Sequence, residues 1–144
     1  MKPAPFTYHA PATVADVAAL LAQYGDDAKA LAGGQSLIPM LSLRLARFEH
    51  LVDLNRVPEL SGITRNNGTV SIGAVTRQAE VGRSADIADA VPLLAKATPL
   101  IGHFQIRNRG TLGGSIAHAD PASEYPAVAI ALRANMVAAG PTGR

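Results

Sequence analysis

Apolar side chains recur at helical spacing near the start of the chain and predict one amphipathic helix over Val14–Tyr24. Thr13 precedes this run as a candidate N-cap, and Asp16 three residues later forms an imperfect capping box. Gly25 follows the run and is expected to end the helix. The positions that carry the pattern are Val14, Val17, Leu21 and Tyr24.

Short apolar runs bounded by turn residues predict strands. Residues 28–34, "AKALAGG", are interpreted as a short buried strand that runs into a glycine turn, and residues 50–54, "HLVDL", as a second strand. Ser36 could cap a short helix after the glycines. Two β-type runs flank Asn66-Asn67-Gly68, and Asn-Gly favours a tight hairpin turn. Thr76 is expected to cap a helix that reaches about Gly82.

The second half of the chain is richer in helical patterns. Residues 85–100 predict one or two helical pieces with Pro92 near a start, and residues 124–134 predict a helix with Pro126 in its first turn. Residues 135–140 resemble the beginning of a strand. The pattern is α+β, and a composition shift near residues 55–60 suggests two parts, 1–55 and 56–144. Because the final strand would have no partner, we expect the chain to be a fragment.

Composition narrows the possible classes of protein. The 144 residues are 48% hydrophobic and 17% charged, which is typical of one globular domain or two small ones. The net charge is +2 and the basic residues are scattered, so nucleic acid is a poor candidate partner. The absence of cysteine excludes disulfides and cysteine-ligated clusters within this chain. With no signal peptide and no apolar run of spanning length, we expect a cytoplasmic protein.

Two glycine-rich stretches carry the candidate chemistry: residues 31–40, "LAGGQSLIPM", and residues 106–121, "IRNRGTLGGSIAHADP". A serine hydrolase is disfavoured, because the nucleophile elbow needs glycine where Ile38 stands. His118 and Asp120 are two residues apart, but two ligands do not make a metal site. The chain contains neither a Walker A motif nor the Rossmann glycine fingerprint.

The remaining chemical interpretation is anion binding. Glycine lets a backbone approach a ligand closely, and successive backbone N–H groups can then surround phosphate oxygens. Gln35 and Ser36 add side-chain donors to the first stretch, and Thr111 and Ser115 add hydroxyls to the second. Two such loops could hold the two phosphates of a dinucleotide. Local chemistry alone does not separate this interpretation from two ordinary glycine turns, which are common in loops.

A family resemblance favours anion binding over two ordinary glycine turns. "LAGGQSLIPML" and "IRNRGTLGGSIAHADPASEYP" together resemble the FAD-binding (medium) subunit of the molybdenum hydroxylases, which includes the medium chain of carbon monoxide dehydrogenase and the flavin domain of xanthine dehydrogenase. The resemblance covers essentially the whole chain. It implies a two-part FAD-binding domain of the vanillyl-alcohol-oxidase or PCMH type, C-terminally truncated so that the family's last domain is absent.

The resemblance also implies residue roles, all of them in binding FAD. No catalytic residue and no metal ligand is implied. Asp120 or Glu124 would contact the ribose or adenosine side, although Glu124 stands where some relatives carry Asp. Ile101 would lie near the isoalloxazine. The first glycine stretch would surround the pyrophosphate through Ala32, Gly33, Gly34, Gln35, Ser36 and Leu37. The second stretch would also contact the cofactor, through Thr111, Gly113, Gly114 and Ser115.

The implied function is electron transfer by an oxidoreductase component. Substrate would be oxidised at a molybdenum–pterin centre on a large subunit, and electrons would pass through [2Fe–2S] clusters on a small subunit to FAD and then to an external acceptor. Such subunits form hetero-oligomers, here expected to be a dimer of heterotrimers. A truncated chain could hold FAD weakly or be inactive. The alternative is a truncated assembly module that binds no flavin and docks the partner subunits.

Overall fold

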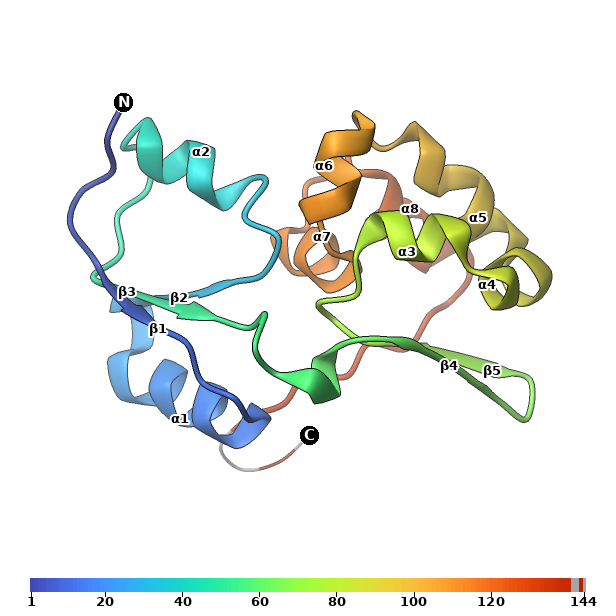
Figure 1. Cartoon of the computed structure of the whole chain (residues 1–144), viewed down its shortest axis with the longest axis horizontal. Helices are drawn as coiled ribbons and strands as arrows, with labels where there is room; N and C mark the ends of the chain where they lie inside the picture. The colour runs from blue at the N-terminus through green and yellow to red at the C-terminus, as the bar shows by residue number, and fades with distance from the viewer. Residues whose placement is uncertain (141–142, 144) are drawn as a thin grey trace. The chain divides into compact units, whose positions relative to one another are not determined.

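A computed structural model describes residues 1–140 and 143 (Figure 1). The chain forms two compact units. Unit 1 comprises Met1–Leu60 together with the described residues of Met136–Arg144, and unit 2 comprises Ser61–Asn135. Each unit has a hydrophobic cluster of its own and is described separately.

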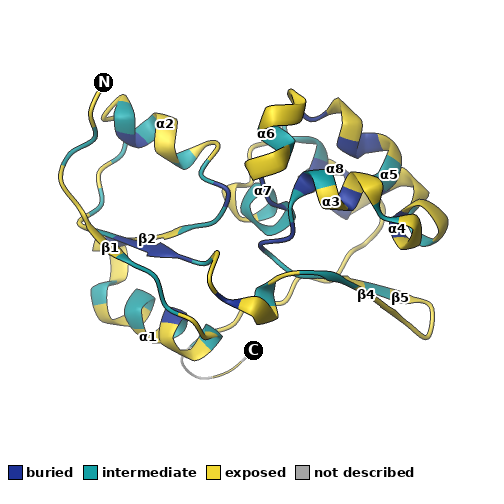
Figure 2. Cartoon of the chain, viewed as in Figure 1, coloured by how far each residue is buried: buried dark blue, intermediate teal, exposed yellow. Residues whose placement is uncertain are grey.

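Unit 1 is built on a parallel sheet of three strands in the order β1-β3-β2. The strands are β1 (Thr7–His9), β2 (Ala28–Leu31) and β3 (His50–Asp53). Parallel neighbours need crossover connections, and these contain α1 (Val14–Tyr24) and α2 (Leu37–Ser42). Leu51 and Val52 on the central strand are 1% and 0% exposed (Figure 2). The second predicted strand is therefore confirmed, and it is the centre of the sheet.

The predicted first helix is confirmed with the same bounds. Thr13 caps α1 by accepting a hydrogen bond at its Oγ1 from the Asp16 amide at 3.1 Å, and Gly25 ends the helix with a φ of +52°. Val17 packs with Val52 and Val57 in the core of unit 1. The prediction for β2 was right about the strand but wrong about its burial. Only its first residue, Ala28, is buried, because β2 lies at the edge of the sheet.

Unit 2 begins with the predicted hairpin, which is confirmed. Strands β4 (Ile63–Asn66) and β5 (Thr69–Ile72) pair antiparallel, and Asn66 lies opposite Thr69. The two loop residues, Asn67 and Gly68, have φ values of +48° and +80°. This left-handed backbone explains why asparagine and glycine occupy the turn.

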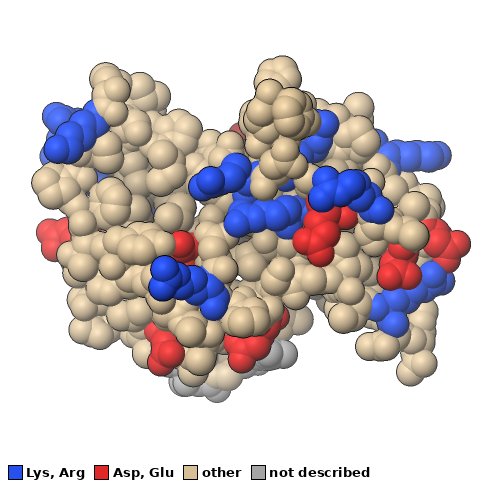
Figure 3. Space-filling view, viewed as in Figure 1, with Lys and Arg blue, Asp and Glu red and all other residues tan. Residues whose placement is uncertain are grey.

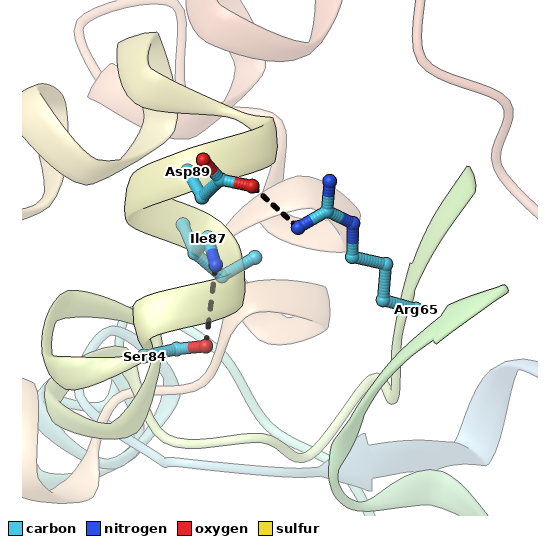
Figure 4. Close-up of polar contacts among 4 residues, drawn as sticks. All are labelled: Arg65, Ser84, Ile87 and Asp89. Atoms are coloured by element: carbon cyan, nitrogen blue, oxygen red, sulfur yellow. Dashed lines mark hydrogen bonds and ion pairs between the residues drawn. The ribbon is translucent and has the colours of Figure 1, made fainter. Parts of the chain in front are cut away.

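Six helices make up the rest of unit 2. Tyr125 is 1% exposed at their centre, and its hydroxyl lies 3.0 Å from the Thr98 Oγ1. Burial raises the pKa of Tyr125, although the hydrogen bond with Thr98 opposes the shift. Figure 4 shows Ser84 capping one helix by accepting from the Ile87 amide at 3.3 Å. The helices are α3 (Gln78–Arg83), α4 (Ala85–Ala90), α5 (Pro92–Ala97), α6 (Phe104–Arg109), α7 (Leu112–His118) and α8 (Glu124–Ala131).

Three local predictions were wrong. Thr76 does not cap α3: its Oγ1 accepts from the Gly62 amide at 2.9 Å and donates to the Gly62 carbonyl at 3.0 Å. Ser36 stands at the N-cap position of α2, but its side chain makes no capping hydrogen bond. Residues 135–139 form no strand, and Gly140 makes an isolated bridge with Gly143. Among residues 1–140 and 143, no helix has the length and apolar character needed to cross a bilayer.

Candidate functional site

The first glycine motif, residues 32–37, leaves the carboxyl end of β2 and leads into α2. In open sheets with parallel strands, ligands bind outside the carboxyl ends of the strands. Gly33 is buried against the unit, while Gln35 and Ser36 are exposed. The fold therefore places the first motif where a ligand can reach its outer side.

The backbone amides of the first motif are available. In the part of the chain that the structure describes, the N–H groups of residues 33–37 have no hydrogen-bond acceptor. Carbonyl oxygens of the same motif are used: Gly34 accepts from the Ile38 amide at 3.0 Å, and Ser36 accepts from the Met40 amide at 3.3 Å. Five consecutive unpaired donors are a suitable arrangement for binding an anion.

Gly34 is required by the backbone of this motif. Its φ is +72°, a conformation that costs a residue with a side chain about 1–2 kcal/mol. A Cβ at this position would lie 3.0 Å from the Ile38 Cγ1 and 3.3 Å from the Leu31 Cδ1. Glycine thus keeps the motif compact and leaves its outer side open.

A polar network that the sequence did not reveal supports the first motif. The Asn55 Nδ2 donates to the Ala32 carbonyl at 2.9 Å and also to the Asp53 Oδ1. That same oxygen accepts from the Asn55 amide at 2.9 Å, and the Tyr8 hydroxyl donates to the other carboxylate oxygen. The only sequence signal was a pair of polar residues, Asp53 and Asn55, at the end of an apolar strand.

The network sets the protonation of Asp53. Asp53 is only 9% exposed, and this burial opposes ionisation of its carboxyl group. The hydrogen bonds from Tyr8 and Asn55, with the nearby Arg56, outweigh burial and hold the pKa of Asp53 below its usual value. The hydrogen bond to Asp53, followed by burial, raises the pKa of Tyr8. Asp53 is therefore an ionised acceptor at neutral pH.

The second glycine motif, residues 111–115, is not a loop of free amides. It forms the N-cap and first turn of α7, and the amides of residues 112–115 already have acceptors within unit 2. Leu112 donates to the Thr76 carbonyl at 3.1 Å, and Gly113 donates to the Ala74 carbonyl at 2.9 Å. The Gly114 amide donates to the Thr111 Oγ1 at 3.1 Å, and the Ser115 amide to the Thr111 carbonyl at 3.2 Å. The amides of residues 112–115 are thus paired within unit 2, and contacts of this motif with a cofactor stay a prediction.

Glycine in the second motif serves packing. A Cβ on Gly113 would lie 2.6 Å from the Cα, Cβ and carbonyl oxygen of Ala74. The hydroxyls are also engaged: Thr111, 2% exposed, caps α7, and the Ser115 Oγ lies 2.8 Å from the Ser123 Oγ. These contacts join α7 to the segment after the hairpin and to the start of α8.

The other predicted residues of unit 2 lie in different settings. Ile101 is 9% exposed and belongs to the core of unit 2. Asp120 is exposed, and its Oδ1 accepts from the Ala122 amide at 2.9 Å in a turn. Glu124 is half-buried in the first turn of α8. Their contacts with a cofactor stay predictions.

Charge and metal chemistry add little to these observations. On the face drawn in Figure 3, acidic side chains lie among the basic ones in each unit. Arg107 uses its Nη1 within unit 2, where it donates to the carbonyls of Ile101 at 2.7 Å and Gly102 at 3.0 Å. Among the described residues, no three His, Asp or Glu side chains gather as a metal site.

Comparison with known proteins gives consistent matches along the whole chain. Residues 4–144 match the family described as "FAD binding domain in molybdopterin dehydrogenase". The chain is 51% identical over 144 residues to the carbon monoxide dehydrogenase medium chain of Hydrogenophaga pseudoflava, covering all of this chain and 50% of that protein. It is 50% identical over 138 residues to the 6-hydroxypseudooxynicotine dehydrogenase complex subunit alpha of Paenarthrobacter nicotinovorans, covering 96% of this chain and 47% of that one.

A solved structure agrees. A chain of the Hydrogenophaga pseudoflava carbon monoxide dehydrogenase that lacks the Mo-pyranopterin moiety of its molybdenum cofactor matches with a TM-score of 0.98 and 52% identity, covering 100% of this chain and 50% of that chain. The chain thus spans about half the length of the relatives it matches.

Proposed function

Because the chain belongs to the family of FAD-binding domains of molybdopterin dehydrogenases, we propose that it binds FAD as the flavin-carrying part of a molybdenum hydroxylase. The observation that supports this function best is the row of five unpaired amides at residues 33–37. A pyrophosphate carries two negative charges and many acceptor oxygens, and backbone amides can hold it without a Lys or Arg side chain.

We assign the pyrophosphate to the first motif alone. Gly34 fits this role, since a side chain there would meet Ile38 and distort the loop. The hydroxyl of Ser36 and the amide of Gln35 are exposed and can add donors. The first motif thus provides the hydrogen bonds that a phosphate group needs.

We propose that the second motif contacts the cofactor in a different way. The amides of residues 112–115 are engaged, so we infer contacts through the surfaces of Gly114 and Ser115 rather than through an amide site, with Thr111 and Gly113 holding that surface in place. The carboxylates of Asp120 and Glu124 can accept hydrogen bonds from ribose hydroxyls. We propose that Ile101 provides an apolar wall near the isoalloxazine.

We propose an electron-transfer role, which membership of the family supports. FAD would supply the redox chemistry, and residues of this chain would bind and orient it without acting as acids, bases or nucleophiles. We propose that the electrons come from [2Fe–2S] clusters on a small partner subunit, after substrate oxidation on a large molybdenum–pterin subunit, in a dimer of heterotrimers. An external acceptor would take the electrons from the flavin.

Titration of FAD into the 144-residue chain, followed by flavin fluorescence, tests the binding step. We expect saturable quenching that Gly34→Asp weakens by at least tenfold, because the substitution adds strain and a negative charge beside the phosphates. Gly25→Asp is the matched control: this glycine of unit 1 also has a positive φ, but a Cβ there would meet nothing within 4 Å. It adds the same charge at another strained glycine, so it should lower the stability of the chain but change the Kd by less than about twofold, because Gly25 ends α1 and belongs to neither glycine motif.

Two results would count against FAD binding at the first motif. If the wild-type chain shows no saturable quenching while it still captures partner subunits, the assembly-module alternative replaces the proposed function. If Gly34→Asp and Gly25→Asp bind FAD equally well, the pyrophosphate lies elsewhere.

A further inference from the structure

The polar network of Tyr8, Asp53 and Asn55 lies across the carboxyl ends of all three strands of unit 1. Tyr8 is on the edge strand β1, Asp53 ends the central strand β3, and Asn55 reaches the Ala32 carbonyl just after the other edge strand β2. Residues far apart in the sequence thus converge on the first residue of the glycine motif.

The ionised state of Asp53 fixes the orientation of the Asn55 side chain. An ionised carboxylate only accepts hydrogen bonds, so the side-chain group of Asn55 that faces Asp53 must be its NH₂. The same NH₂ donates its second hydrogen to the Ala32 carbonyl. Asp53 therefore determines that Asn55 presents a donor, and not its carbonyl oxygen, to the glycine motif.

The geometry of the peptide bond relates the direction of the Ala32 C=O to that of the Gly33 N–H. In a trans peptide the C=O of one residue and the N–H of the next point in opposite directions. When Asn55 holds the Ala32 C=O, the Gly33 N–H points away from the network. Gln35 acts in the same way one peptide later: its Nε2 donates to the Gly33 carbonyl at 3.2 Å, which turns the Gly34 N–H outward.

We propose that Asn55, oriented by the Asp53 carboxylate, is a positioning residue that aims the Gly33 amide of the first glycine motif at the cofactor's phosphate groups. This role rests on the proposed function, because it assumes that the motif binds the pyrophosphate of FAD. Asp53 and Tyr8 act through Asn55 and do not touch the ligand.

The first measurement needs no ligand. The ¹⁵N chemical shift reports the environment of the Gly33 amide in the free chain. Asn55→Ala, and Asn55→Asp, which removes the NH₂ at constant size, should shift the Gly33 resonance. Asp53→Asn should do the same more weakly, since a neutral amide can also accept from Asn55.

The second measurement separates positioning from stability. Val17→Ala is the control, because Val17 lies in the core of unit 1 and far from the motif in sequence. Both Asn55→Ala and Val17→Ala should lower the thermal stability of the chain. Only Asn55→Ala should raise the Kd for FAD, by about three- to tenfold, which is the range for one lost hydrogen bond.

The outcomes distinguish this role from the proposed function. If wild type binds FAD, and Asn55→Ala leaves both the Kd and the Gly33 amide unchanged, Asn55 is not a positioning residue although FAD binding stands. If both variants raise the Kd equally, Asn55 acts through stability alone and positioning is rejected. If wild type binds no FAD, the proposed function fails, and the positioning role toward phosphate fails with it even where the Gly33 resonance shifts.

Discussion

Substituting Gly113 by alanine tests the close contact that defines the second glycine motif. Gly113 is in the first turn of α7, where alanine would normally be the better helix former by about 1 kcal/mol. The structure predicts the opposite result. The new Cβ would lie 2.6 Å from three atoms of Ala74, two of them backbone atoms that cannot rotate away.

The expected loss follows from the displacement needed to relieve this contact. Non-bonded carbon atoms prefer a separation of about 3.5–4.0 Å, so the start of α7 would have to move by roughly 1 Å. That movement stretches the hydrogen bonds from Gly113 to Ala74 and from Leu112 to Thr76, each worth about 0.5–1.5 kcal/mol. Overpacking itself costs about 1–3 kcal/mol. After the gain in helix propensity, we expect a net loss of about 1–5 kcal/mol.

Urea denaturation followed by far-UV circular dichroism measures the free energy of unfolding. Gly82→Ala is the matched control, because Gly82 is also helical in unit 2 but its added Cβ would meet side-chain atoms alone, the Thr98 Cγ2 at 3.1 Å and the Thr98 Cβ at 3.8 Å. That variant should remain within about 1 kcal/mol of wild type, the size of the propensity gain. A Gly113→Ala chain that is as stable as wild type, or more so, would refute the close contact.

Three further outcomes are expected from the same assay. Thr111→Val removes the cap of α7 and should cost about 1 kcal/mol, and a change below about 0.3 kcal/mol would contradict the capping role. Asp89→Asn breaks the exposed ion pair with Arg65 (Figure 4) and should cost less than about 1 kcal/mol, a difference that disappears in high salt; a larger loss, or one that persists in salt, would be wrong for an exposed pair. Burial opposes ionisation of Asp53, but its hydrogen bonds lower its pKa, so its contribution to stability is present above about pH 4 and is lost as the pH falls through that lowered pKa. Asp53→Asn should therefore be less stable than wild type at pH 6 and approach it in acid, and a constant difference between pH 6 and pH 2.5 would contradict this account.

Local chemistry predicted the elements that are determined locally. The helix Val14–Tyr24 has its own cap and stop, and the hairpin has an Asn-Gly turn whose φ values few other residues adopt readily. Pro92 is the first residue of α5, as expected from its missing N–H. In each case the decisive residues lie within a few positions of one another, so a single stretch of sequence contains the whole signal.

Predictions failed where a distant partner decides the structure. Thr76 was expected to cap the next helix, but its hydroxyl bonds to Gly62, fourteen residues earlier. The network that supports the first motif joins Tyr8 to Asp53 across 45 residues, and no local pattern marks it. Burial of β2 was overestimated because strand order, which places β2 at an edge, cannot be read from one strand.

The two glycine pairs show why a sequence motif alone could not define the site. Gly33-Gly34 is followed by glutamine and serine and Gly113-Gly114 by serine, and local chemistry did not separate an anion-binding loop from an ordinary turn at either pair. The second pair instead begins a helix, because Thr111 caps it and the missing Cβ of Gly113 lets it pack on Ala74. The amides of residues 112–115 donate to protein acceptors, whereas those of residues 33–37 have no acceptor among the described residues. Because unpaired donors suit anion binding better than paired ones, these hydrogen bonds, and not the glycines themselves, are the reason we propose the first pair as the phosphate site.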